Sequence, residues 1–170
     1  MRIIDADGHV LERDIPWADL LEEPYRSRAP RAVKDNRGFN FVMIDGKLTP
    51  KPVGKACSFV GAPRSHHPQP TTGMVGPTQR LKDMDLEGID TAILFGTSPF
   101  LSLPFVEDKD LACAVARVYN NWLADYCKPD PRRLKGVALT AIQDPVEAVK
   151  ELRRAVEELK FVAVATPPIS

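Results

Sequence analysis

The sequence predicts an α/β fold in which strands and helices alternate along the chain. Mainly apolar runs of strand length occur at 91–95 and 134–141, as expected for strands that are covered on both faces. Residues 109–127 and 145–159 instead repeat apolar side chains every three or four positions, which is the period of an amphipathic helix. Strands that alternate with helices form parallel sheets through right-handed crossovers. Four such strands, expected at 4–9, 91–95, 134–141 and 161–165, make either half of an eight-stranded barrel or a small open sheet.

The first strand carries polar side chains at its end. The segment 3–10 reads Ile-Ile-Asp-Ala-Asp-Gly-His-Val. Because successive side chains of a strand alternate between its two faces, Asp5, Asp7 and His9 are expected to share one face. The other face is expected to carry Ile4, Ala6 and Gly8. Carboxylate oxygens and an imidazole nitrogen crowded at a strand end predict half of a metal site. Hydrogen bonds to loop backbone are the alternative role for such residues.

A long irregular segment, 14–76, separates the first strand from the regular part of the chain and holds many of the prolines. Within it, 38–44 alternates like a strand, and Asp45-Gly46 supplies the turn of a β-hairpin. Residues 50–76 show no period and predict one long loop, of the kind that forms lids or binding loops. The chain 1–170 is therefore predicted to be a single domain with an insertion at 14–76.

The regular part begins after Pro77 with a short helix over 78–87. Gly88 ends it, since glycine suits the position just beyond a helix C-terminus. The next helix, over 109–127, is stopped by two prolines that follow it. Asn120 and Asn121 of this helix are predicted to be polar edge residues. Its buried stripe is predicted at Leu111, Val115, Val118, Trp122 and Tyr126.

The last helix begins with a recognisable cap. Asp144 is suited to accept hydrogen bonds from the first turn, and Pro145 is suited to open the helix. Its charged residues are predicted to face outward. Its buried side is predicted at Val146, Val149, Leu152, Val156 and Leu159. A strand over 161–165 follows.

Composition and charge narrow the classes of function. Hydrophobic residues make up 44% of the chain, and 23 Lys plus Arg balance 23 Asp plus Glu, so neither a nucleic-acid surface nor an anionic-membrane surface is indicated. No apolar stretch approaches the roughly 20 residues that span a bilayer, and the chain does not open on a secretory signal pattern. Cys57, Cys113 and Cys127 are widely spaced and predict reduced thiols. We therefore expect a cytoplasmic protein.

Five segments, taken in order, carry a family resemblance. They are Ile-Asp-Ala-Asp-Gly-His at 4–9, Arg-Leu-Lys-Asp-Met-Asp-Leu-Glu-Gly-Ile-Asp at 80–90, Asn-Asn-Trp-Leu at 120–123, Arg-Leu-Lys-Gly-Val-Ala at 133–138 and Gln-Asp-Pro at 143–145. Together they resemble the amidohydrolase-related, metal-dependent hydrolases and decarboxylases, a family that includes aminocarboxymuconate-semialdehyde decarboxylase. The resemblance runs along nearly all of the chain. It implies a parallel barrel of the TIM type, of which this chain carries the first four strands, with a divalent metal at the C-terminal mouth.

The resemblance implies that Asp7 and His9 are metal ligands. The family usually has His-x-His where this chain has Asp7-Gly8-His9, so a carboxylate stands where an imidazole is common. This change makes the donors harder and favours Mn²⁺, Fe²⁺ or Mg²⁺ over Zn²⁺, without excluding zinc. Asp5 is expected to orient its neighbours as a hydrogen-bond acceptor rather than to bind the metal itself.

The resemblance also implies ligands that this chain lacks. The family's remaining histidines and aspartate come from the second half of the barrel, whereas this chain has only His66 and His67 besides His9. A catalytic metal needs about three protein ligands, and a four-stranded half leaves two open sheet edges. We therefore expect a homo-oligomer or a second chain that supplies the rest of the barrel.

The implied function is metal-dependent hydrolysis or non-oxidative decarboxylation of a small carboxylate or aromatic acid. A non-catalytic half-barrel that serves assembly, with a partner chain or with itself, is the alternative.

For several further residues, two alternative roles are considered. His66 and His67 are either exposed loop residues or a lid contact or third ligand. Arg80 either meets a substrate carboxylate or forms an ion pair on its helix, and Phe100 either lines a pocket or packs beneath the insertion.

Overall fold

A computed structural model of the chain describes residues 1–12, 15–49, 54–55, 58–59, 74 and 76–166. Its larger sheet has four strands in the order β1-β7-β8-β9, and every neighbouring pair is parallel. The strands are β1 (Ile4–His9), β7 (Thr91–Phe95), β8 (Leu134–Leu139) and β9 (Ala163–Ala165). The predicted strand order and parallel pairing are therefore confirmed, although β8 ends two residues earlier and β9 begins two residues later than predicted.

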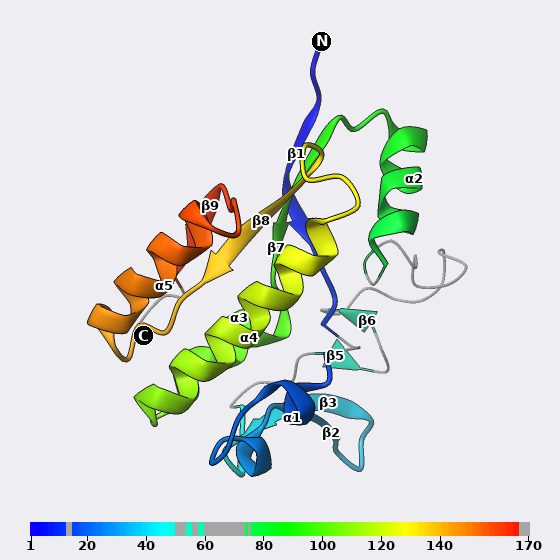
Figure 1. Cartoon of the computed structure of the whole chain (residues 1–170). Helices are drawn as coiled ribbons and strands as arrows, with labels where there is room; N and C mark the ends of the chain where they lie inside the picture. Colours follow the sequence, from blue (N-terminus) through cyan, green and yellow to red (C-terminus); the bar gives the residue numbers. More distant parts are fainter. Residues whose placement is uncertain (13–14, 50–53, 56–57, 60–73, 75, 167–170) are drawn as a thin grey trace.

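Helices connect these strands as the periodicity predicts. Figure 1 shows α4 and α5 lying side by side against the sheet, with α2 near β1. The main helices are α2 (Pro77–Glu87), α4 (Lys109–Cys127) and α5 (Pro145–Glu157). Two short elements between β7 and α4, namely α3 (Ser98–Ser102) and η3 (Leu103–Phe105), are not predicted. Gly88 ends α2 in the left-handed region at φ 71°, where glycine has no Cβ penalty.

The core lies between α4 and the parallel sheet. On α4 the predicted Leu111, Val115 and Tyr126 are buried, while the predicted Val118 and Trp122 are half-buried and pack against the same cluster. The centre of the stripe also includes the buried Tyr119 and Leu123, which are not among the residues predicted for it. These side chains pack in one cluster with Ala92, Leu94 and Ala138 of the sheet.

The predicted burial of α5 is wrong for three of its valines. Val146, Val149 and Val156 are 66%, 47% and 48% exposed, whereas Glu151 and Ala155 are buried. The reason is the position of α5 beside α4 (Figure 1). Glu151 bonds to Asn120 of α4 and Ala155 lies in the core cluster, whereas the valines lie on a side that the described residues leave exposed. The period of apolar residues predicts which side of a helix is apolar, but it does not predict which element packs against that side.

The segment before β9 also differs from the prediction. Phe161, predicted to begin the strand, is buried and lies against Gly136 of β8. A Cβ on Gly136 would come within 2.5 Å of the Phe161 ring, so the ring occupies the space that a side chain would need. Val162 N donates to Gly136 O at 3.1 Å, and regular pairing of β9 with β8 begins only at Ala163.

A second, antiparallel sheet lies between β1 and α2 in the chain. Its path is β2-β3-β5-β6, with β4 paired to β3. Figure 1 shows this sheet and α1 beyond the carboxyl end of β1, at the opposite end from the N-terminus. The elements are α1 (Trp17–Leu20), η1 (Arg26–Arg28), β2 (Arg31–Lys34), β3 (Phe39–Ile44), β4 (Lys47–Leu48), β5 (Gly54–Lys55) and β6 (Ser58–Phe59).

Two observations qualify the expectations for this region. Asp45 and Gly46 form the turn between β3 and β4, both with positive φ, as the Asp-Gly pair predicts. The stretch 50–76, predicted to be one loop, contributes the two short strands β5 and β6.

Ion pairs join this sheet to the start of α4, because Arg28 contacts both Asp45 and Asp108, at 2.7 and 2.8 Å.

The described cysteines are thiols without a disulfide partner. Cys113 is half-buried and Cys127 is buried. Burial raises the pKa of Cys127 to about 12 and also raises the pKa of Cys113, so neither is prone to form a thiolate. Cys57 lies outside the described residues. Among the described residues, none of the helices has the length and apolar character needed to cross a bilayer.

Candidate metal centre

A bulge in β1 decides which polar side chains meet. Asp5 pairs with Ala92 and Gly8 pairs with Leu94, so three steps along β1 match two along β7. The extra residue reverses the alternation, and Asp5 lies on the face of Gly8 rather than on that of His9. A Cβ on Gly8 would lie 3.0 Å from Oδ2 of Asp5. The prediction that Asp5, Asp7 and His9 share one face is therefore wrong for Asp5.

Asp5 helps to form the bulge. Its Oδ1 accepts a hydrogen bond from the main-chain N–H of Asp7 at 3.0 Å. It thus acts on the backbone beside the candidate ligands, which agrees with the orienting role expected for it. Ile4 and Ala6, which are expected on the other face, are exposed at this edge strand.

Asp7 and His9 lie together at the carboxyl end of β1. Oδ1 of Asp7 is 3.6 Å from Nε2 of His9, and the two side chains are 90% and 38% exposed. The His9 ring is tilted against the ring of Phe95, with centroids 6.2 Å apart. The pairing of His9 with Phe95 in the sheet explains this contact, since partners in a parallel ladder project from the same face.

The loop after β7 reaches His9 from the neighbouring strand. Oγ1 of Thr97 lies 3.2 Å from Nδ1 of His9. The main-chain N–H groups of Thr97 and Ser98 in turn donate to the two carboxylate oxygens of Glu12, at 2.5 and 3.1 Å. Burial raises the pKa of Glu12 to about 7, although these N–H groups act in the opposite direction. The hydrogen bonds from Thr97 and Ser98 to Glu12 join the loop after β7 to the loop after β1, close to the candidate ligands.

Arg80 supports the same strand end from α2. Its Nη2 donates to the main-chain carbonyl oxygen of His9, and its Nε donates to the Tyr126 hydroxyl at 3.2 Å. Both of these bonds go to groups of the fold itself, and the two roles considered for Arg80 stay predictions. Phe100 is half-buried and packs against the hydrophobic core.

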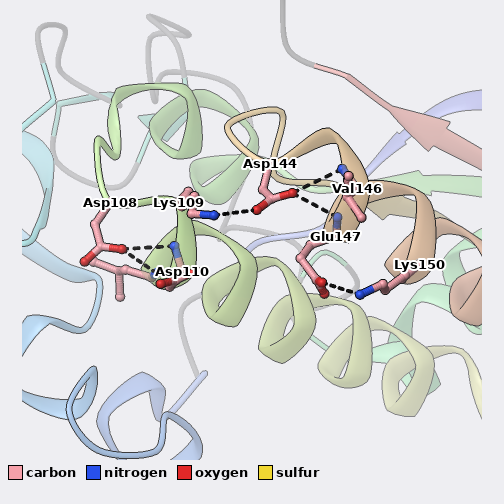
Figure 2. Close-up of polar contacts among 8 residues, drawn as sticks. Asp108, Lys109, Asp110, Asp144, Val146, Glu147 and Lys150 are labelled. Atoms are coloured by element: carbon pink, nitrogen blue, oxygen red, sulfur yellow. Dashed lines mark hydrogen bonds and ion pairs between the residues drawn. The ribbon is translucent and has the colours of Figure 1, made fainter.

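The carboxyl ends of the strands are bordered by two helix N-termini. Figure 2 shows Asp108 and Asp144 capping α4 and α5, with Lys109 between them. Asp144 accepts from the N–H groups of Val146 and Glu147, both at 3.1 Å, and pairs with Lys109 at 3.0 Å. The hydrogen bond from Glu147, followed by that from Lys109, lowers the pKa of Asp144. The cap predicted at Asp144 is therefore confirmed.

The donors fit part of a metal site. A carboxylate oxygen and an imidazole nitrogen side by side are suitable ligands for a divalent cation. Three or more His, Cys, Asp or Glu side chains do not come together in a metal-binding arrangement anywhere in the described ranges. His66 and His67 lie outside the described residues. Asp7 and His9 therefore remain predicted ligands, and they account for two of the about three that a catalytic metal requires.

From the sequence, the loop 96–100 that contains Thr97 is expected at the same mouth as His9, but no individual role is predicted for Thr97 or for Glu12. A signal for Thr97 exists, since it directly follows β7 and the carboxyl ends of neighbouring parallel strands meet at one edge. Glu12 gives no comparable signal, because a glutamate after an apolar pair is ordinary in a surface segment. Only the three-dimensional structure buries it.

The fold and the site define a class: a parallel α/β half-barrel with a pair of metal-type donors at the carboxyl end of its first strand. The model of the amidohydrolase family matches residues 4–169. The chain therefore belongs to the amidohydrolase family, as its motifs predict.

Known proteins agree with this assignment. Gamma-resorcylate decarboxylase from Rhodococcus jostii (strain RHA1) is 41% identical over 83 residues, which are 49% of this chain and 25% of that protein. An amidohydrolase from Mycobacterium avium subsp. paratuberculosis K-10 has a similar structure, with a TM-score of 0.74, 18% identity and coverage of 96% of this chain and 48% of that one. A dihydroxybenzoic acid decarboxylase from Polaromonas sp. JS666, with bound manganese and the inhibitor 2-nitroresorcinol, has a TM-score of 0.53, 24% identity and coverage of 96% and 38%.

These likenesses confirm the predicted fold. The chain corresponds to about half or less of each structural relative and matches a quarter of the curated one. The four parallel strands and their helices are thus one part of a larger barrel of the TIM type in the relatives.

Proposed function

We propose that the chain supplies the first-strand part of the metal site of a decarboxylase that acts on a hydroxylated aromatic acid. The observation that carries this proposal is the pairing of Asp7 and His9 at the carboxyl end of β1, in a chain whose curated relative is a gamma-resorcylate decarboxylase. Hydrolysis by the same site is the broader possibility within the family. The relatives' named reaction favours decarboxylation.

The residues of this chain have separate roles in that proposal. Asp7 and His9 would hold the cation, and Asp7 favours a hard ion such as Mn²⁺ over Zn²⁺. A bound divalent ion supplies Lewis acidity, which polarises an aromatic acid for loss of carbon dioxide or activates water for hydrolysis. Arg80 holds the carbonyl group of His9, and the exposed part of the Phe95 ring offers an apolar wall beside His9. The remaining ligands would come from strands that complete the barrel.

We also propose that residues 14–76 form an insertion, and that its described part, the small antiparallel sheet, covers the mouth. The small sheet lies beyond the carboxyl end of β1 (Figure 1). It is tied to the start of α4 by Arg28, and by an ion pair of 2.7 Å between Lys47 and Glu107. A segment anchored at the rim of the strand ends is well placed to shield a substrate from water.

The ligand assignment is tested by substitution. Asp7→Ala and His9→Ala should each remove most of the Mn²⁺ that the chain binds while leaving its circular dichroism unchanged, because both side chains lie at an exposed strand end. Metal content is measured by elemental analysis after dialysis against Mn²⁺. Asp125→Ala, at an exposed carboxylate of α4, is the control. Metal content that is unchanged in both variants would contradict the assignment.

The activity is tested in two arms with Mn²⁺ and gamma-resorcylate. One arm contains the chain alone, and the other adds a separate polypeptide with strands five to eight of the Rhodococcus relative. Release of carbon dioxide that needs this chain, and that is lost in His9→Ala, supports the decarboxylase. Failure to release carbon dioxide in either arm contradicts it.

A non-catalytic half-barrel for assembly is the second candidate. The exposed valines of α5 favour it, since an apolar side that is left open commonly marks an interface. A chain that assembles into a defined oligomer, binds no Mn²⁺ and releases no carbon dioxide is the outcome that selects this candidate.

A further inference from the structure

The hydroxyl group of Thr97 is not used by the helix that this residue begins. Thr97 holds the N-cap position of α3, where a threonine oxygen normally accepts a hydrogen bond from the first turn. Within this fully described helix, the Thr97 side chain makes no such capping bond. Its Oγ1 instead lies 3.2 Å from Nδ1 of His9.

Glu12 takes over the backbone donors that a capping side chain would satisfy. Its two carboxylate oxygens accept from the N–H groups of Thr97 and Ser98. Glu12 and Thr97 are only 8% and 2% exposed, so the bonds form where an unpaired polar group is costly. The carboxylate therefore holds Thr97 by its main chain and leaves the hydroxyl directed at His9.

The loop has little room to move away from this position. A Cβ on Gly96 would come within 2.6 Å of the Tyr119 hydroxyl oxygen. The absence of a side chain thus allows the start of the loop to lie directly against α4. With Gly96 on one side and Glu12 on the other, Thr97 is fixed by packing as well as by hydrogen bonds.

We propose that Thr97 is a positioning residue for His9, and that the buried carboxylate of Glu12 holds Thr97 in place. The proposal rests on the metal site proposed above. A neutral imidazole binds a metal through its unprotonated nitrogen, and a hydrogen bond at the other nitrogen selects which one that is. With Nδ1–H donating to Thr97 Oγ1, the lone pair is on Nε2, which lies 3.6 Å from Oδ1 of Asp7. The two predicted donors then meet the same ion.

The tautomer of His9 in the metal-free chain is the direct test. Nitrogen-15 NMR of the neutral ring should report the Nδ1–H form in the native chain. Thr97→Val keeps the shape but removes the acceptor, and it should shift the ring toward the Nε2–H form. Thr97→Ser keeps a hydroxyl and should keep the native tautomer. Ser102→Ala is the matched control, because it removes a buried hydroxyl whose bond goes to Ser98 O at 2.8 Å.

Titration with Mn²⁺ alone gives a second readout. Paramagnetic broadening of resonances near β1 should show an affinity that falls by about 10- to 100-fold in Thr97→Val, the usual effect of removing a partner of a metal ligand. Thr97→Ser and Ser102→Ala should retain the native affinity. Glu12→Gln, checked for folding by circular dichroism, should shift the tautomer in the same direction as Thr97→Val.

Different results of these experiments bear on the Thr97–His9 contact and on the metal site itself. A native chain with His9 in the Nε2–H form, or a folded Thr97→Val chain with unchanged tautomer and Mn²⁺ affinity, overturns the role of Thr97. An unchanged ring in folded Glu12→Gln overturns the role of Glu12. A native chain that holds the Nδ1–H form yet binds no Mn²⁺ contradicts the metal site while supporting the positioning contact.

Discussion

Asn120 uses its side-chain amide to bond the backbone at the end of β8. Its Oδ1 accepts from Leu139 N, and its Nδ2 donates to Leu139 O, both at 2.9 Å. Nδ2 also donates to Glu151 at 2.8 Å. Burial acts to raise the pKa of Glu151, but hydrogen bonds from Arg154 and Asn120 outweigh it and lower the pKa. The prediction that Asn120 is a polar edge residue is wrong, because it is completely buried.

Asn120→Ala should therefore be strongly destabilising. It leaves buried backbone groups of Leu139 unpaired and removes one partner of Glu151, and we expect a loss of about 2–4 kcal/mol in the free energy of unfolding. Urea unfolding measures it. Asn121→Ala, at an exposed residue of the same helix, removes a single side-chain bond from Arg154; it is the control and should change stability by less than about 0.5 kcal/mol. Equal effects of the two substitutions would contradict the buried role of Asn120.

Glu12 should make stability depend on pH. Below pH 4.5 the carboxyl is protonated in both the folded and the unfolded chain. Between pH 4.5 and about 7 the unfolded chain releases its proton while the folded chain retains it. The contribution of Glu12 to the free energy of unfolding therefore falls as pH rises. The loss is on the order of 3 kcal/mol. Among the described residues, the Tyr119 hydroxyl is a titratable group that interacts with this carboxyl in the core.

The measurement compares urea unfolding of native and Glu12→Gln chains across that pH range. The variant should lack this decline, even if its overall stability is lower. Glu22→Gln, at an exposed glutamate, controls for the removal of one charge. The same decline in Glu12→Gln as in the native chain would show that another group causes it.

At the scale of elements, close contact between β8 and the segment before β9 sets where the fourth strand begins. The ring of Phe161 lies over Gly136 and displaces regular pairing to Ala163. Periodicity predicts this strand correctly in type but not in its first residue, because the start depends on a contact between two elements.

Gly136→Ala should destabilise the chain by about 1–3 kcal/mol, the usual cost of overpacking a filled core. Its Cβ would lie 2.5 Å from the Phe161 ring. Thermal unfolding followed by circular dichroism measures the change. Combining it with Phe161→Leu should cost less than the sum of the two single changes, because the smaller side chain releases the clash. Strict additivity would argue against the contact.

For the whole molecule, the open sides of the sheet are the dominant feature. At β1 the exposed Ile4 marks one edge, and at β9 the exposed Val164 marks the other. Together with the outer valines of α5, they leave apolar surface that a complete barrel would cover. This agrees with relatives in which the matched region is only part of a longer chain.

The chain by itself should therefore associate through this surface. Sedimentation velocity at increasing concentration should show species larger than a monomer, and Val149→Lys combined with Val156→Lys should shift them toward the monomer. Leu48→Lys, at an exposed leucine of the small sheet, is the control and should leave association unchanged. A native chain that stays monomeric throughout contradicts this prediction.

Much of the fold can be predicted because it depends on local pattern. Strand-length apolar runs, helical periods and the caps at Gly88 and Asp144 each involve neighbouring residues. The adjacency of Asp7 and His9 follows in the same way from their spacing of two along one strand. The outer valines of α5 cannot be assigned from pattern alone, since an apolar stripe is the same whether its partner is in this chain or elsewhere.

The sequence by itself thus determined the parallel α/β order, the family and the polar end of the first strand. Only the tertiary structure decided that a bulge turns Asp5 away from His9, that Glu12 is buried and that Thr97 reaches the His9 ring from 88 residues along the chain. The reason is physical. Periodicity and capping are set by nearest neighbours, whereas register, burial and contacts between distant loops are set by how the packed elements meet.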